Sequence, residues 1–192
     1  MKIMKSLSTL AIAIMAFACS PAPVQEQAPT EQPSAEHQIA RGQYLVNVIG
    51  CNDCHSPKRM GPNGPEPDPA RLLSGYPHDA ALAQVDTSEL KSWALFSPDL
   101  TAAVGPWGVS YAANLTSDDT GIGLWTEAQF IKCMREGKYK GLEGSRPLLP
   151  PMPWPNFAQM TDDDLKAVFA YLKSTKPVRN IVPPPVMLAD LK

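Results

Sequence analysis

The sequence lacks the features that mark several broad classes of protein. It contains no run of basic residues and has a formal net charge of −2, so nothing in it indicates a nucleic-acid partner. Its longest apolar run, residues 7–18, is too short to span a bilayer as a mature helix. Cysteine is also scarce, with four residues, so the role of each one can be considered separately.

Proline, by contrast, is abundant. The chain has 192 residues, of which 44% are hydrophobic, enough to form one hydrophobic core of ordinary size. It also has 21 prolines, and proline fixes φ and removes a backbone donor. This composition predicts a few short helices joined by long ordered loops.

Two cysteines and a histidine are grouped at Cys51, Cys54 and His55. Thiols at this spacing can each add to one vinyl group of a haem, and the adjacent imidazole can then ligate the iron. A redox-active dithiol would be expected in a βαβ context, and a zinc site would need a second pair of ligands. Neither context is visible, so the motif predicts one covalently attached haem c.

The first residues have the pattern of an export signal. Lys2 and Lys5 precede the apolar run, so we expect residues 1–18 to form a signal peptide. Cys19 follows directly, at the position where a bacterial lipoprotein carries its lipid, although Phe17 is unusual for such a site. Simple cleavage after Ala18 is the alternative. We expect lipidation of Cys19 and a periplasmic, membrane-anchored protein.

The rest of the chain divides into a tether, one domain and a tail. Residues 19–37 are rich in Pro, Gln, Glu, Ala and Ser, a composition that cannot form a core. We expect one haem-binding domain over residues 38–180 and a surface tail over 181–192.

Three helices are predicted inside that domain. The first extends from about residue 38 to 49 and delivers the two thiols. The second starts at the Thr126 capping box and ends at Gly137, with Cys133 as a buried apolar residue in it. The third is capped by Thr161 and ends near Pro177.

The long segment 56–113 is harder to interpret. Its first third holds five prolines and is expected to lack regular structure. Residues 94–97 and 101–104 could pair as a small hairpin. We also expect one of the carbonyls of the proline-rich first third to accept a hydrogen bond from His55 Nδ1, because a ligating imidazole usually has its second nitrogen bonded.

A second iron ligand would distinguish an electron carrier from a protein that binds small molecules at the iron. Met152 is the leading candidate, because four prolines in residues 150–155 fix the backbone around it and Trp154 adds an apolar wall. A thioether is a weak, soft ligand that favours ferrous iron and raises the reduction potential. The other candidates are less well placed: Met160, Met60, Met134 and His78.

Together these features resemble the class I c-type cytochromes, and more closely the haem modules of cytochrome subunits of membrane-bound alcohol and sugar-acid dehydrogenases. The resemblance rests on residues 51–55, 114–116, 120–126, 151–154 and 160–172. It implies a mostly α, class I cytochrome c fold, with three to five helices around one haem. It also implies thioethers from Cys51 and Cys54, with His55 as proximal and Met152 as distal ligand.

The chain also departs from those subunits, which usually carry three such modules where this sequence carries one. We therefore expect a monohaem electron carrier, not an enzyme, that passes single electrons between periplasmic redox partners. Two alternatives remain open. One is the cytochrome subunit of a larger dehydrogenase complex, and the other is a haem enzyme or gas sensor with an open sixth coordination site.

Lipidation of Cys19 can be tested by mass spectrometry of the mature protein isolated from its natural host. We expect the N-terminal peptide to begin at Cys19 and to carry the added mass of the lipid. A mature chain with an unmodified Cys19 would contradict the lipoprotein prediction.

Overall fold

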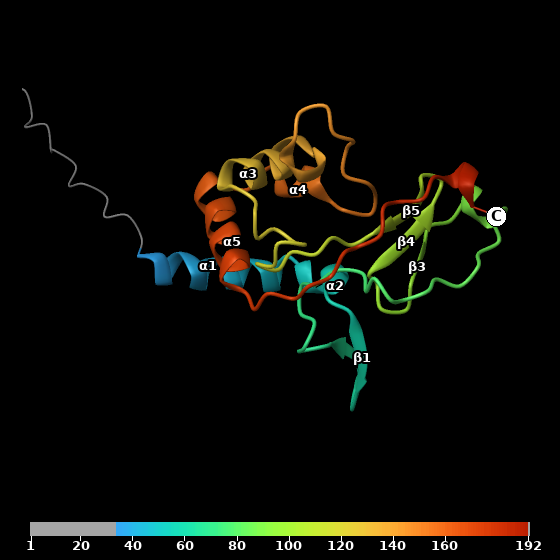
Figure 1. Cartoon of the computed structure of the whole chain (residues 1–192), viewed down its shortest axis with the longest axis horizontal. Coiled ribbons are helices and arrows are strands. Elements are labelled where there is room, and N and C mark those ends of the chain that lie inside the picture. Colours follow the sequence, from blue (N-terminus) through green and yellow to red (C-terminus); the bar gives the residue numbers. More distant parts are fainter. Residues whose placement is uncertain (1–33, 192) are drawn as a thin grey trace, which may run out of the picture. The chain divides into compact units, whose positions relative to one another are not determined.

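The computed structural model of the protein describes residues 34–191 (Figure 1). The predicted signal peptide, Cys19 and most of the predicted tether therefore lie outside the described residues. The α-helices are α1 (Ala35–Val48), α2 (Cys51–His55), α3 (Glu127–Glu136), α4 (Trp154–Phe157) and α5 (Asp162–Ser174). The strands are β1 (Lys58–Gly61), β2 (Gly64–Pro67), β3 (Leu95–Phe96), β4 (Ala102–Gly105) and β5 (Gly108–Tyr111). Three short 3-10 helices complete the description: Glu89–Lys91, Tyr139–Gly141 and Leu188–Asp190.

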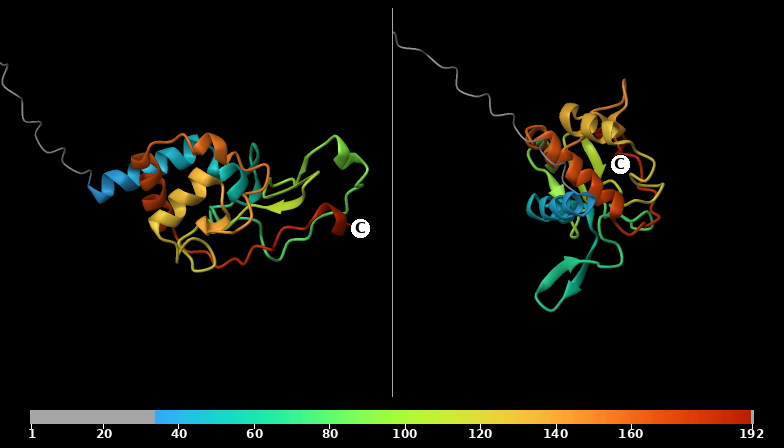
Figure 2. Two further views of the ribbon diagram at one scale, coloured as in Figure 1. Left: turned by 90° about the horizontal axis from the view of Figure 1, so that it is seen from above. Right: turned by 90° about the vertical axis from the view of Figure 1, so that its left-hand side faces the viewer.

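Helices α1 and α5 pack directly against each other, as both views in Figure 2 show. Gly42 on α1 makes this approach possible, because a Cβ built there would lie 1.9 Å from the Ala167 carbonyl oxygen on α5. Around this crossing lies a hydrophobic core to which α3 contributes as well. Its buried members are Leu45, Val46, Leu73, Ile122, Phe130, Met134, Leu165, Val168, Phe169 and Leu172.

The predicted helices are confirmed, with small changes at their ends. Helix α1 begins at Ala35 because the Ser34 hydroxyl accepts a hydrogen bond from the His37 amide, so residues 35–37 belong to a helix and not to the tether. Thr126 and Gln129 form the expected capping box of α3, in which Cys133 is buried. Thr161 caps α5, which ends at Ser174.

The segment after His55 contains more regular structure than predicted. Strands β3 and β4 form the expected antiparallel pair, and β5 adds a third strand to it. The expectation of no regular structure near residue 60 was wrong, because β1 and β2 form a hairpin. Pro65 and Pro67 alternate with Gly64 and Glu66, so the residues between the prolines can make the hydrogen bonds to β1.

The last residues are also more closely attached than a surface tail would be. Val186 pairs with Val109 of β5 through two backbone hydrogen bonds, of 2.7 and 3.1 Å. The Asn180 side chain is buried. Helix α4 was not predicted either, and it starts at Trp154 with Pro155 in its first turn, where a missing N–H has no cost.

Within residues 34–191 none of the helices combines the length and the apolar character that crossing a membrane requires.

The α1 and α5 contact gives a direct test of the fold. Changing Gly42 to Ala should lower the free energy of unfolding by roughly 1–3 kcal/mol, because the added methyl group must push α1 away from α5. Gln43→Ala, at an exposed neighbouring position of the same helix, serves as control and should change stability little. Equal stability of both variants in thermal unfolding would contradict the close contact.

Candidate functional site

The cysteine and histidine motif forms helix α2, which lies between the other helices and the three-stranded sheet (Figures 1 and 2). Gly50 separates α1 from α2 with φ of +77°, a left-handed conformation that glycine adopts without a steric penalty. Cys51 and Cys54 are half-buried free thiols, and Cys51 packs against the hydrophobic core. The expected helix does end just before the motif, but the motif also forms a short helix of its own, which was not predicted.

His55 is buried, and its orientation is set by one hydrogen bond. Its Nδ1 lies 2.7 Å from the carbonyl oxygen of Ala113. The acceptor therefore lies at the far end of residues 56–113 and not in their proline-rich first third, where it was expected, because the packing of distant segments decides which carbonyl reaches the imidazole. Burial lowers the pKa of His55, which favours the neutral imidazole. With the proton on Nδ1, the Nε2 lone pair remains available as a metal ligand.

The position of the Ala113 carbonyl is set by the pairing of its own segment with a segment earlier in the chain. Residues 73–76 pair with residues 112–115 through Leu115 N to Leu73 O at 2.8 Å and Tyr76 N to Ala112 O at 3.0 Å. The Gly75 amide also donates to the His55 carbonyl, at 2.8 Å. Gly75 has φ of +76°, and a Cβ there would lie 2.4 Å from the Ala112 carbonyl oxygen. Only glycine fits between these two segments without moving them.

Two buried asparagines link these segments to the C-terminal part of the chain through hydrogen bonds. Asn180 donates to the carbonyls of Ser74 and Tyr76, at 2.7 and 2.8 Å. Asn114 donates to the Val178 carbonyl at 2.9 Å and accepts from the Thr116 amide. The sequence analysis assigned neither asparagine a role, because their partners are backbone groups far away in the chain.

Lys58 is a third residue that the sequence analysis missed. Its ammonium group donates to the carbonyls of Asn52, Asp53 and Ser56, at 3.1, 2.8 and 2.6 Å. These carbonyls lie at the C-terminal end of α2, where a positive charge is favourable. Partial burial lowers the pKa of Lys58.

The donor groups of this site fit a covalently bound haem better than a metal ion alone. Within residues 34–191, no three side chains of His, Cys, Asp or Glu converge as metal ligands do, so the zinc alternative has no second pair of ligands. Burial raises the pKa of Cys51 to about 11, which disfavours a reactive thiolate pair. Two thiols on one helical turn beside a buried, oriented imidazole suit two thioethers and one axial ligand.

Among the candidates for the second ligand, Met152 and Met160 contact the same core as Cys51. Met134 is buried within α3, and Met60 is 77% exposed. His78 is exposed on its loop and its Nδ1 lies 3.2 Å from Asn180 Oδ1. Met60 and His78 are thus exposed, whereas Met134 is a member of this core and Met152 and Met160 pack against it.

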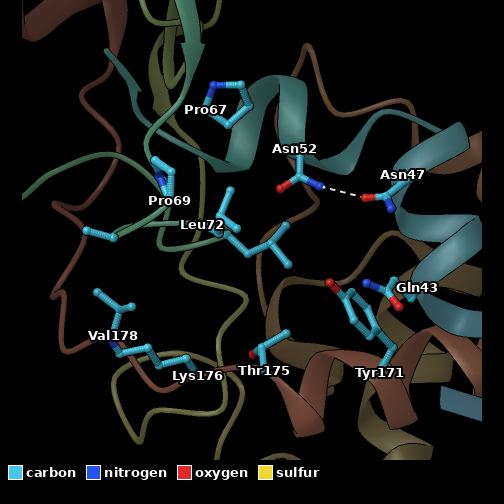
Figure 3. Close-up of a pocket in the computed structure, with 12 residues that line it drawn as sticks. Gln43, Asn47, Asn52, Pro67, Pro69, Leu72, Tyr171, Thr175, Lys176 and Val178 are labelled. Atoms are coloured by element: carbon cyan, nitrogen blue, oxygen red, sulfur yellow. Dashed lines mark hydrogen bonds between the residues drawn. The ribbon is translucent and has the colours of Figure 1, made fainter. Parts of the chain in front are cut away.

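A cavity of about 530 Å³ adjoins α2 without containing the two thiols or His55. Figure 3 shows the Asn52 side chain bonded to Asn47 at its edge, with Gln43 and Tyr171 facing the same space. Asn52 lies between the two cysteines of the motif, so this cavity flanks the attachment helix.

The chain is similar to known cytochromes. The family model for cytochrome c matches residues 39–176. The chain is 44% identical over 142 residues to the cytochrome c subunit of a quinone-dependent alcohol dehydrogenase from Gluconacetobacter polyoxogenes, covering 73% of this chain and 22% of that protein. It is 31% identical over 155 residues to the fructose dehydrogenase cytochrome subunit of Gluconobacter japonicus, covering 78% and 24%. The chain thus spans about a quarter of the length of these relatives.

The position of Gly75 against the Ala112–Ala113 backbone can be tested with a matched pair of variants. Gly144 has a similar φ of +69° but no atom within 4 Å of its Cβ position. Gly144→Ala should therefore lose only about 1–2 kcal/mol of unfolding free energy, from left-handed strain. Gly75→Ala should lose roughly 1–3 kcal/mol more and should shift the NMR signal of the His55 Nδ1 proton. Equal losses of unfolding free energy would show that the position of the Ala113 carbonyl does not depend on a glycine at residue 75.

Proposed function

The chain belongs to the cytochrome c family, and we propose that it is a monohaem electron carrier that passes single electrons between redox proteins in the periplasm. The arrangement of α2 carries this proposal. Cys51 and Cys54 form the two thioether links, and the buried imidazole of His55, fixed by the Ala113 carbonyl, ligates the iron.

Met152 is proposed to occupy the opposite side of the iron. It lies in the proline-rich segment before α4 and packs against the core that also contacts Cys51. With both His55 and Met152 as ligands, the chain's own residues would exclude water and exogenous ligands from the iron. The bound group would supply a single electron that moves on and off the iron, and the soft thioether favours the reduced form.

Such a carrier needs only brief contact with its partners. Transient redox pairs typically bury less than about 1,200 Å², and for a chain of net charge −2 we expect docking without a broad ring of lysines. Export through residues 1–18 and a lipid on Cys19 would hold the domain near a membrane, where a tether would let it reach donor and acceptor.

The relatives support a second candidate, in which the chain serves as the cytochrome subunit of a larger dehydrogenase. Relatives of this kind are named as cytochrome subunits of alcohol, fructose and gluconate dehydrogenases. Affinity purification of the tagged chain from its host separates the two candidates. Stoichiometric recovery of a dehydrogenase catalytic subunit would favour the subunit, and recovery of the chain alone would favour the free carrier.

The ligand assignment is tested with Met152→Ala, using Met160→Ala as the matched control. Met152→Ala should remove the sulfur-to-iron charge-transfer band at the red end of the visible spectrum and allow the reduced protein to bind carbon monoxide. Its reduction potential should fall by at least about 60 mV, a tenfold change in relative affinity for one electron. Met160→Ala should keep the band.

The opposite pattern, with the band lost only in Met160→Ala, would transfer the assignment to Met160. Carbon monoxide binding by the unmodified reduced protein at neutral pH would instead support a haem enzyme or gas sensor with an open sixth site.

A further inference from the structure

The three-stranded sheet of β3, β4 and β5 has no part in the ligand set, yet one of its side chains reaches the segment that carries Met152. Ser110 on β5 is 8% exposed, and its hydroxyl oxygen lies 2.6 Å from the carbonyl oxygen of Pro150, two residues before Met152. In Figure 1 the orange segment before α4 reaches toward this sheet. The bond joins residues 40 positions apart in the sequence.

A second hydrogen bond orients the Ser110 hydroxyl. Trp107 Nε1 donates to Ser110 Oγ at 3.3 Å. A hydroxyl has a single proton to give, and the Ala103 carbonyl lies 3.4 Å away, against 2.6 Å for Pro150. The proton is therefore directed to Pro150, and the three groups form a chain in which each bond strengthens the next.

Side chains of β5 point alternately to the two faces of the sheet, so the Ser110 contact lies on one face and its neighbours lie on the other. Val109 and Tyr111, on either side of Ser110, line an apolar groove of about 560 Å³. Because successive side chains of a strand point to opposite faces, Ser110 faces away from this groove. Its hydroxyl thus lies on the face of the sheet that meets the Pro150 carbonyl.

On the C-terminal side of Met152, the ring of Trp154 is held in place by α3. A Cβ built on Gly137, at the end of α3, would lie 2.4 Å from the Trp154 ring, so this ring packs directly on the α3 backbone. Pro151 and Pro153 restrict the two residues next to Met152. The chain on either side of Met152 is therefore held in place, by the hydrogen bond of the Pro150 carbonyl to the sheet and by the packing of the Trp154 ring on α3.

We propose that Ser110 is a positioning residue for Met152: by holding the Pro150 carbonyl it keeps the thioether directed at the iron. This inference rests on the proposed function, in which Met152 is the distal ligand. It assigns a role to the three-stranded sheet, which acts as a support for the distal ligand from outside the helical core.

Loss of this bond should make the distal ligand dissociate more often. A net hydrogen-bond contribution of the usual size corresponds to about a three- to tenfold change in an equilibrium. In Ser110→Ala the observed rate of imidazole binding to the ferric holoprotein should therefore rise about three- to tenfold, since imidazole can enter only when Met152 leaves. The Met–iron band should weaken as well.

Ser117 provides a matched control. Its hydroxyl donates to the Thr175 carbonyl at the same distance of 2.6 Å, but at the C-terminal end of α5. Ser117→Ala should lose comparable thermal stability and leave imidazole binding unchanged. Ser110→Thr, which keeps the hydroxyl, should bind imidazole at nearly the unmodified rate. Trp107→Phe, which removes only the orienting donor, should show a smaller increase and remains informative if Ser110→Ala does not fold.

The results of these experiments distinguish a failure of the positioning role of Ser110 from a failure of the Met152 ligand assignment. If Met152→Ala keeps the Met–iron band, the ligand assignment fails and the role of Ser110 fails with it. If Met152→Ala loses the band while Ser110→Ala and Trp107→Phe bind imidazole at the same rate as Ser117→Ala, Met152 stands and the positioning role of Ser110 alone is overturned.

Discussion

The hydrogen bond between His55 Nδ1 and the Ala113 carbonyl is the interaction on which the site depends. A buried imidazole without it could rotate or take the wrong tautomer, and neither state would offer Nε2 reliably to an iron. Several residues outside the cysteine and histidine motif keep the two groups of this hydrogen bond in position. Gly75 allows the two flanking segments to approach, and Asn114 and Asn180 hold them to the C-terminal chain.

The two sides of the proposed haem site are supported by different parts of the domain. On the proximal side, α2 is an extension of the rigid α1 and α5 pair, and Lys58 stabilises its C-terminal end. On the distal side, the segment with Met152 is short of regular structure and depends on contacts at its ends. This difference suits the chemistry, because imidazole is a strong ligand and a thioether is a weak one that needs external positioning.

Much of the fold could be predicted because its signals are local. The capping residues Thr126 and Thr161 and the left-handed Gly137 mark helix ends within a few residues of sequence. The β1–β2 hairpin was missed because proline count argued against strands, although prolines at alternate positions leave the hydrogen-bonding residues free. The C-terminal segment was taken for a tail because Val186 gives no sign of its pairing with Val109.

The sequence alone predicts how a haem would be attached, since two thiols and an imidazole at this spacing require no distant partner. For the second iron ligand it leaves a few candidates, four methionines and His78. The folded structure is needed to show which distant groups these segments meet: the Ala113 carbonyl bonds to His55, and the Ser110 hydroxyl bonds to the Pro150 carbonyl, two residues before Met152. The physical reason is that every residue has a backbone carbonyl, so which one accepts a bond depends on how distant segments pack.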